Sequence, residues 1–183
     1  MTPPPPAPDS RTIDPDRVRI ERDGPVAHVV LARPDKMNAL DAAMFSSLVA
    51  AGDEVAADAT VRAVVLRGEG RSFCAGLDLG SFSAMADQGS GDGAGSGSGG
   101  GIVDRLPGRP SNLFQEAAHV WRSLPQPVVA ALHGHVLGGG LQVALGADIR
   151  FCAPDATLSV MEMRWGLLPD MTGPQTLVRL CGL

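Results

Sequence analysis

Two glycine-rich turns, each preceded by an apolar run, constrain this chain more than any other feature. The first turn, Phe-Cys-Ala-Gly-Leu-Asp-Leu at 73–79, comes shortly after the apolar run 61–66. The second begins at His133, directly after the apolar run 128–132, and ends in three glycines at 138–140. Apolar runs of this length are typical of buried strands, and glycine lets backbone N–H groups approach a ligand closely. The pattern therefore predicts two buried strands that end in backbone hydrogen-bond donors.

The chemistry of the two turns stays open at this level. A helix that starts at Gly139 or Gly140 would carry partial positive charge at its free N–H groups, and two such turns side by side would form an oxyanion hole. Glycine triplets also occur simply where a helix packs tightly on a sheet. Nucleotide binding fits less well, because the segment 138–143 lacks the third glycine of a dinucleotide fingerprint and no Gly-Lys-Ser/Thr follows for a P-loop.

The order of the predicted elements indicates an α/β fold with a mixed sheet. Residues 18–22 and 26–31 flank an Asp-Gly turn and predict a hairpin. A helix follows in which residues 44–55 repeat at helical spacing, and Asp41 is its expected N-cap. The remaining expected elements are strands at 61–66, 128–132, 148–152 and 157–160 and helices at 112–123 and about 141–146. This order predicts helical crossovers between parallel strands.

The chain is expected to form one domain with an arm and a loop attached. Its 183 residues suffice for a single core. Residues 1–15 are proline-rich and polar and predict a disordered arm, which leaves 16–183 as the core. Gly and Ser make up nearly all of 89–101, so a mobile loop is expected at about 86–104, either a plain surface loop or a flap beside a substrate entrance. The chain stops just after an apolar helical start at Thr176, which suggests that a further helical region is missing.

Composition and charge exclude several classes of partner. The net charge of −5, the pI near 5.2 and the absence of tyrosine argue against nucleic acid, which needs a basic face or an aromatic platform. No run approaches the roughly 18 apolar residues of a membrane span, and the first residues are not a signal peptide. Cys74, Cys152 and Cys181 are expected to be buried, inert thiols in a cytoplasmic protein. Neither they nor His133 and His135 have metal-ligand spacing, so no metal is expected.

Four segments taken together resemble the enoyl-CoA hydratase/isomerase (crotonase) superfamily. They are Arg-Pro-x-x-x-Asn-Ala-Leu at 33–40, the turn at 73–79, Pro-Val-Val-Ala-Ala-Leu-His-Gly-His-Val-Leu-Gly-Gly-Gly at 127–140 and Ala-Asp-Ile-Arg at 147–150. They occur in the order typical of the family, over about 18–183. The resemblance implies a crotonase-like spiral of ββα units with mixed sheets that binds acyl-CoA esters.

The same resemblance implies where the acyl-CoA is held. The thioester oxygen would accept hydrogen bonds from the backbone N–H groups of Leu77 and Gly139. Coenzyme A would bind partly through the loop 33–38, where Arg33 and Lys36 either meet the phosphates or are solvated surface charges. The other residues expected at the site are Ala75, Gly76, Asp78, Gly138 and Gln142. Coenzyme A is then part of the substrate and no separate cofactor is implied. The full-length protein is expected to be a homo-oligomer, a trimer or a dimer of trimers.

The acid and base residues depart from the hydratase pattern. Hydratases of this family use two carboxylates, because one group must activate water and another must supply a proton to the α-carbon. The first position is occupied here by Gln142, which can orient a water but cannot exchange a proton. The second is Glu162, which is expected to be the general base, with an exposed strand-end charge as the plainer alternative. Its neighbours are expected to desolvate it partly; they are Met161, Met163 and Trp165.

Asp170 lies eight residues after Glu162. This spacing is similar to that of dienoyl-CoA isomerases, in which two carboxylates shuttle a proton between distant carbons, whereas simple enoyl-CoA isomerases manage with the single glutamate. A turn or cap residue after Pro169 is the alternative for Asp170. Met161, Met163 and Met171 are expected in the pocket wall or the core.

The leading hypothesis is therefore proton-shuttling isomerisation of an unsaturated acyl-CoA. Glu162 would be the base, Asp170 a second acid or base, and Leu77 and Gly139 the donors. Hydration of a 2-enoyl-CoA, which Gln142 disfavours, is the first alternative. A non-catalytic acyl-CoA-binding protein and a purely structural role in a hetero-oligomer are the others.

Overall fold

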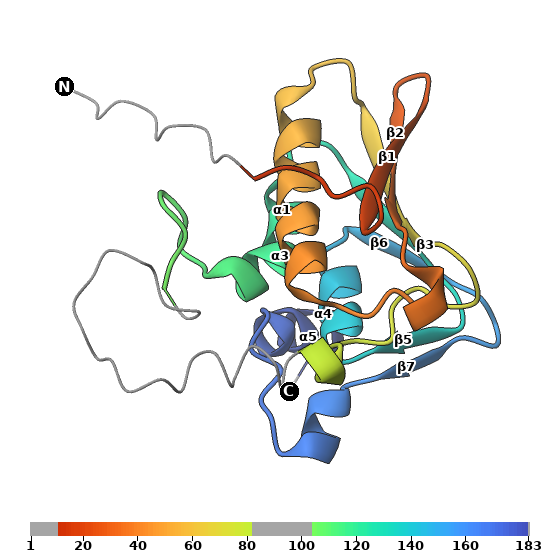
Figure 1. The fold of residues 1–183 in the computed structure, drawn as a ribbon, viewed down its shortest axis with the longest axis vertical. Coiled ribbons are helices and arrows are strands. Elements are labelled where there is room, and N and C mark those ends of the chain that lie inside the picture. Colours follow the sequence, from red (N-terminus) through yellow and green to blue (C-terminus); the bar gives the residue numbers. More distant parts are fainter. Residues whose placement is uncertain (1–10, 82–103, 183) are drawn as a thin grey trace.

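A five-stranded mixed sheet with helices on one face organises the computed structural model, which describes residues 11–81 and 104–182 (Figure 1). The strand order is β1-β2-β3-β4-β6, and β5 and β7 form a separate two-stranded sheet. The strands are β1 (Val18–Asp23), β2 (Val26–Leu31), β3 (Ala63–Gly68), β4 (Val128–Leu132), β5 (His135–Leu137), β6 (Ile149–Cys152) and β7 (Thr157–Ser159). The helices are α1 (Ala42–Ala57), α3 (Leu113–Ser123), α4 (Gly139–Leu145) and α5 (Gly173–Cys181), with short 3₁₀ helices η1 (Pro34–Lys36) and η2 (Met161–Trp165).

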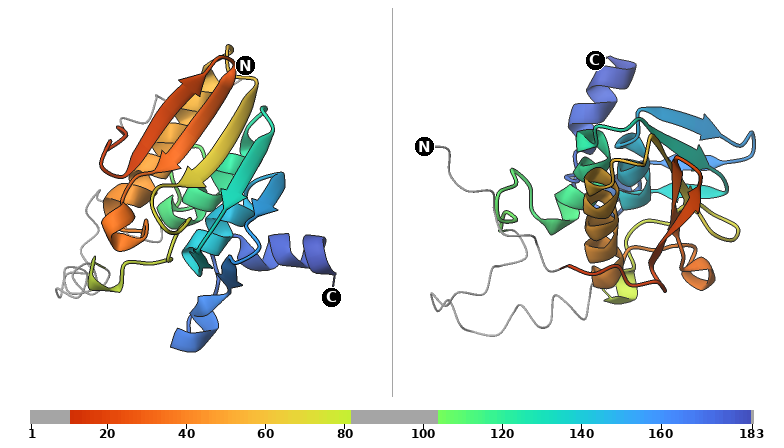
Figure 2. Two further views of the ribbon diagram at one scale, coloured as in Figure 1. Left: turned by 90° about the vertical axis from the view of Figure 1, so that its right-hand side faces the viewer. Right: turned by 90° about the horizontal axis from the view of Figure 1, so that it is seen from above.

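The pairing of the strands confirms the mixed sheet that the sequence predicts. β1 and β2 are antiparallel, with Val18 opposite Leu31. β3 is parallel to β2, β4 to β3, and β6 to β4. Parallel neighbours require crossover connections, and α1 and α3 provide the first two on the same face of the sheet (Figure 2). β3 begins at Ala63, later than predicted, because the N–H of Val61 donates to the Asp58 carbonyl in the turn that closes α1.

Local signals set the ends and the spacing of the helices that cover the sheet. Asp41 caps α1, as predicted, because its Oδ1 accepts from the N–H of Met44 at 2.8 Å. Asn112 begins α3 with a reciprocal capping box. α1 and α3 pack closely because Gly52 faces Val120, where any Cβ would overlap the valine side chain. Apolar residues from both helices and from the sheet then form one continuous core.

The last residues of the predicted N-terminal arm are part of the described structure. Disorder was expected through residue 15, but residues 11–15 pack on the folded part of the chain. The N–H of Asp14 donates to Ser47 Oγ on α1 at 3.0 Å, and Ile13 contacts the core. A hydrogen bond from the arm to the helix thus overrides the polar, proline-rich composition. The rest of the predicted arm and nearly all of the predicted Gly/Ser-rich loop lie outside the described residues, at 1–10 and 82–103.

The second half of the chain carries the short elements around the predicted site. α4 begins at Gly139, earlier than predicted, soon after β5 ends. The region around Glu162 is the 3₁₀ helix η2 rather than the end of a strand, and the helical start expected near Thr176 belongs to α5. The N–H of Gly138 donates to the Ser159 carbonyl at 2.9 Å, which joins the end of β5 to β7. Within 11–81 and 104–182, no helix is long and apolar enough to cross a membrane.

Candidate active site

The two glycine-rich turns lie side by side and are hydrogen-bonded to one another. The N–H of Leu137 donates to the Cys74 carbonyl, and the N–H of Cys74 donates to the His135 carbonyl, both at 3.0 Å. The first turn is also held by Leu40, whose N–H donates to the Gly76 carbonyl at 2.8 Å. These bonds place the first turn directly against the start of α4.

Glycine is required where the two turns touch. Gly76 has a φ of +89°, and a Cβ on it would lie 2.7 Å from the Leu137 oxygen and 3.7 Å from the Gly139 nitrogen. Gly140 is equally confined, since a Cβ there would lie 2.6 Å from the Cys74 Cβ. The close packing of the two turns is therefore one reason for these glycines, and the same packing brings the two backbone N–H groups to one place. The oxyanion hole stays a prediction.

Leu77 and Gly139 each have a backbone N–H that donates to no acceptor in the part of the chain that the structure describes. Gly139 is the first residue of α4, so its N–H has no intrahelical carbonyl to bind. Both residues line one cavity of about 670 Å³. A carbonyl oxygen that accepted from both groups would be held in an oxyanion hole.

The cavity has a largely apolar wall and a few polar groups, as small-molecule sites generally do. Phe45 of α1 and Phe114 of α3 form part of the wall and pack edge to face, with ring centroids 4.7 Å apart. The segment 161–171 contributes much of the remaining apolar lining. The polar side chains that line the cavity are those of Asn112, Gln142, Glu162 and Asp170.

Glu162 and Gln142 are hydrogen-bonded to each other at this cavity. Gln142 Nε2 donates to Glu162 Oε1 at 2.7 Å, and the N–H of Gly173 donates to Gln142 Oε1 at 3.0 Å. The other carboxylate oxygen, Glu162 Oε2, is buried and has no partner among the described residues. The carboxylate lies against Gly138, where a Cβ would be 3.4 Å from Oε1. Glu162 lines the cavity, and a carboxylate oxygen without a partner can accept a proton.

The surroundings of Glu162 differ in part from those predicted. Met161 and Met171 line the cavity, as expected, but Met163 is 73% exposed and Trp165 is 58% exposed. Alternate residues share one face only in an extended strand, whereas η2 is a 3₁₀ helix with three residues per turn. The expected apolar enclosure by all three neighbours was therefore wrong for Met163, which does not line the cavity.

The structure brings most of the predicted site residues to this one cavity. Leu77 and Gly139 line it together with Ala75, Gly76, Gly138, Gln142, Glu162 and Asp170. Sequence reasoning missed the aromatic pair of the wall, Phe45 and Phe114. Helical spacing identifies Phe45 as facing inward, but the same spacing describes a core residue and a cavity wall equally well.

Arg33, Lys36 and Asp78 are the predicted site residues that do not line the cavity. Arg33 Nη1 is 2.8 Å from Asp78 Oδ2 and 3.4 Å from Asp41 Oδ2, and the Arg33 side chain is 13% exposed. Lys36 is exposed on η1. Arg33 therefore ties the loop before α1 to the first glycine turn. Phosphate binding by Arg33 or Lys36 stays a prediction.

The ion pair between Arg33 and Asp78 should make stability depend on pH. Burial by itself raises the pKa of Asp78, but the hydrogen bond and charge of Arg33, with hydrogen bonds from Ser81, hold that pKa below its ordinary value. The pair therefore stabilises the fold above the unfolded-state pKa of about 3.9, and this contribution is lost as the pH falls through the lower folded-state pKa. Asp78→Asn is expected to lower the free energy of unfolding at pH 7 by about 1–3 kcal/mol. Urea denaturation should show that the difference in free energy of unfolding between the wild type and Asp78→Asn shrinks below about pH 4. An equal difference at all pH values would contradict the assignment.

The three thiols should differ sharply in reactivity. Cys74 is completely buried beneath Gly140, and burial raises its pKa to about 12. Cys152 and Cys181 are exposed, which corrects the expectation that all three are buried, because only the Cys74 side chain is packed against the second glycine-rich turn. An aromatic disulfide reagent at pH 8 should label Cys152 and Cys181 rapidly and Cys74 only after unfolding, since the thiolate is the reacting form. Mass spectrometry identifies the sites, and rapid native labelling of Cys74 would contradict this packing.

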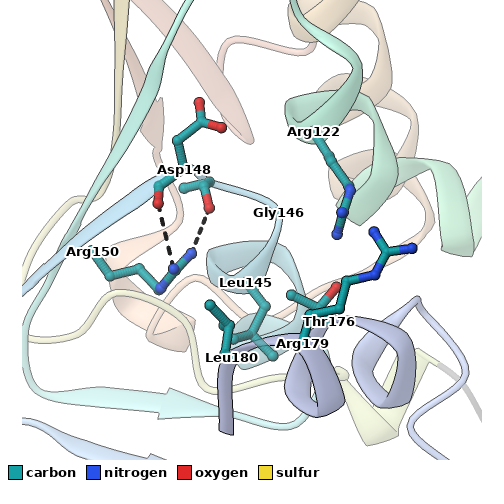
Figure 3. A pocket seen from close by; sticks show the side chains of 9 residues that line it. Arg122, Leu145, Gly146, Asp148, Arg150, Thr176, Arg179 and Leu180 are labelled. Atoms are coloured by element: carbon teal, nitrogen blue, oxygen red, sulfur yellow. Dashed lines mark hydrogen bonds between the residues drawn. The ribbon is translucent and has the colours of Figure 1, made fainter. Parts of the chain in front are cut away.

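A second, smaller hollow of about 360 Å³ lies at the far end of α4 (Figure 3). Arg122, Arg150 and Arg179 line it. Arg150 donates to the carbonyl groups of Ala147 and Asp148, so its guanidinium holds the turn between α4 and β6. This hollow contains neither the two free N–H groups nor the carboxylate of Glu162, and it is separate from the candidate active site.

Known proteins similar to this chain share its fold. The family described as enoyl-CoA hydratase/isomerase matches residues 26–183. The human mitochondrial Delta(3,5)-Delta(2,4)-dienoyl-CoA isomerase is 36% identical over 159 residues, covering 86% of this chain and 46% of its own length. The crystal structure of an enoyl-CoA hydratase from Mycobacterium tuberculosis matches with a TM-score of 0.69 at 30% identity, over 89% of this chain and 56% of that one. A Thermobifida fusca protein solved in complex with acetoacetyl-CoA matches with a TM-score of 0.70 at 31% identity, over 90% and 62%.

The chain belongs to the enoyl-CoA hydratase/isomerase family and has the crotonase fold, as its motifs predict. It spans about half the length of the curated relatives that it matches. Its dienoyl-CoA isomerase relatives are named as mitochondrial or peroxisomal proteins. The cytoplasmic location and the homo-oligomer therefore stay predictions.

Proposed function

We propose that the protein isomerises the double bond of an unsaturated acyl-CoA by moving a proton along the acyl chain. The thioester oxygen accepts from the N–H groups of Leu77 and Gly139, Glu162 removes and returns the proton, and Asp170 is a second acid or base. The observation that carries this proposal is the cavity that unites two N–H groups and a carboxylate oxygen, none of which has a partner among the described residues.

The proton and the electron pair balance without a co-reactant. When Glu162 takes a proton from C2 of a 3-enoyl-CoA, the electron pair moves into an enolate whose oxygen is stabilised by the two N–H donors. The Glu162 carboxyl group then returns the proton to C4, and the double bond lies between C2 and C3. With a 3,5-dienoyl-CoA, Glu162 takes the C2 proton and Asp170, protonated at the start, delivers a proton to C6, which leaves double bonds between C2 and C3 and between C4 and C5. A proton then passes from Glu162 to Asp170 and restores both groups.

Gln142 favours isomerisation over hydration. Adding water needs a second group that exchanges a proton, and a neutral amide does not do so. Both polar atoms of this amide are also engaged, one with Glu162 and one with Gly173. Hydration remains the second candidate, since a protein named as an enoyl-CoA hydratase shares this fold at 30% identity.

The choice of an acyl-CoA as substrate is supported by the relatives. Dienoyl-CoA isomerases from human and mouse are each 36% identical to this chain. The Thermobifida fusca protein was solved with acetoacetyl-CoA bound. The apolar wall around Phe45 and Phe114 suits an acyl chain, which gains free energy when it leaves water.

The test is to incubate the protein separately with 3-enoyl-CoA, 3,5-dienoyl-CoA and 2-enoyl-CoA. Double-bond absorbance is followed and the products are identified by mass spectrometry. Turnover of either of the first two to the shifted double bond supports isomerisation. Formation of a hydroxyacyl-CoA from the third replaces the proposal by hydration. Saturable binding of all three by calorimetry without turnover replaces it by a non-catalytic acyl-CoA-binding protein.

A further inference from the structure

Gln142 connects three elements of the candidate active site through its side chain. It lies on α4, donates to Glu162 on η2, and accepts from Gly173 at the start of α5. The residue is only 3% exposed. Gly173 leaves room for this amide, because a Cβ there would lie 2.7 Å from the amide oxygen of Gln142 and the amide would have to shift. A buried amide whose oxygen and nitrogen are both engaged has little freedom to rotate.

The orientation of this amide follows from its partners. The backbone N–H of Gly173 can only donate a hydrogen bond, so the amide oxygen must face it. The amide NH₂ must then face Glu162, where the partner at 2.7 Å is Oε1. Glu162 is thereby held through one oxygen, while Oε2 is buried without a partner among the described residues.

The geometry points to Gln142 as a positioning residue for Glu162, an inference that rests on the proposed isomerase function. Gln142 holds the carboxylate through Oε1 and leaves Oε2 as the oxygen that takes the proton from the substrate. A charge-assisted hydrogen bond of this kind fixes one carboxylate orientation. The carboxylate lies beside Gly138, directly before α4. The amide at this position thus orients the base without exchanging a proton itself.

Two substitutions test whether Gln142 positions Glu162 or only supports α5. Gln142→Leu removes both hydrogen bonds at similar volume. Gln142→Glu keeps an acceptor for the Gly173 N–H but offers Glu162 a hydrogen only when one of the two carboxyl groups is protonated. Gln175→Leu is the matched control, because Gln175 is exposed on α5 and does not line the cavity.

We expect Gln142→Leu to lower kcat by about 10- to 100-fold with KM nearly unchanged, since hydrogen bonds to charged groups have this order of effect. Gln142→Glu should show a similar loss at neutral pH that is partly recovered as the pH is lowered. A residue that merely supports α5 would not produce this change in the pH profile. Wild-type activity of Gln142→Glu at neutral pH, or an unchanged pH profile, would overturn the inference.

Crystal structures of the two variants test the inference independently of activity. In both, at neutral pH, the Glu162 carboxylate should leave its place against Gly138 or occupy more than one orientation. An unchanged carboxylate in both variants would overturn the positioning role. If the wild type turns over none of the three acyl-CoA substrates, the proposed function fails, and these structures still decide whether Gln142 orients Glu162.

Discussion

Replacing Glu162 by glutamine is expected to lower kcat for isomerisation by about 10²–10⁴-fold, the usual range for removing a general base. The side chains have nearly the same shape, so the hydrogen-bonding distance to Gln142 can be kept while the basic oxygen is lost. Acyl-CoA binding should change little, because the donors for the thioester oxygen are the backbone N–H groups of Leu77 and Gly139. The measurement is kcat and KM for the substrate found active, together with calorimetric binding.

Glu54→Gln is the matched control for Glu162→Gln. Glu54 is exposed on α1 and does not line the cavity, so its replacement removes a charge without touching the candidate site. Both variants should keep the wild-type Tm to within about 1 °C, which corresponds to a few tenths of a kcal/mol in the free energy of unfolding. Retention of more than about one tenth of the wild-type kcat in Glu162→Gln would contradict the assignment of Glu162 as the base.

Gly76→Ala is expected to reduce both stability and activity. A Cβ at Gly76 needs an unfavourable positive φ and would lie 2.7 Å from the Leu137 oxygen. Left-handed strain and overpacking together cost about 2–5 kcal/mol, which corresponds to a fall in Tm of roughly 5–15 °C for a domain of this size. Relief of the clash would move the adjacent N–H of Leu77, so kcat should fall by up to about 10²–10³-fold.

Gly24→Ala separates the two causes of the Gly76→Ala effect. Gly24 also has a positive φ, of +54°, but a Cβ there meets no atom within 4 Å. Its replacement should therefore cost only the left-handed strain, about 1–2 kcal/mol, and leave kcat unchanged. Equal loss of activity in both variants would show that the contact between the two turns does not control the donors.

Much of this fold could be predicted from the sequence because its signals are local. Apolar runs, the Asp-Gly hairpin turn and the Asp41 cap act over a few residues, so their patterns survive in the linear sequence. The errors have two sources, one a contact between distant segments and the other a local conformation. Residues 11–15 pack because Asp14 reaches Ser47, and Met163 turns outward because η2 is a 3₁₀ helix rather than a strand.

The candidate site shows the same difference between local motifs and contacts that join distant elements. The motifs predicted the two candidate donors and both carboxylates that line the cavity, since each belongs to a short segment with its own pattern. They did not identify the aromatic wall, the ion pair between Arg33 and Asp78, or the bonds of Gln142. Each of these joins residues from different elements, so none leaves a local pattern.

By itself, the sequence determined the two glycine turns, the mixed sheet that carries them and the absence of a second carboxylate at position 142. Only the tertiary structure decided that the turns touch at Gly76 and Gly140, and that Gln142 leaves one oxygen of Glu162 free. The physical reason is the distance along the chain over which each interaction acts. Backbone conformation and hydrophobic period are set by neighbours in the chain, whereas a hydrogen bond between residues 20 positions apart exists only once α4, η2 and α5 are packed together.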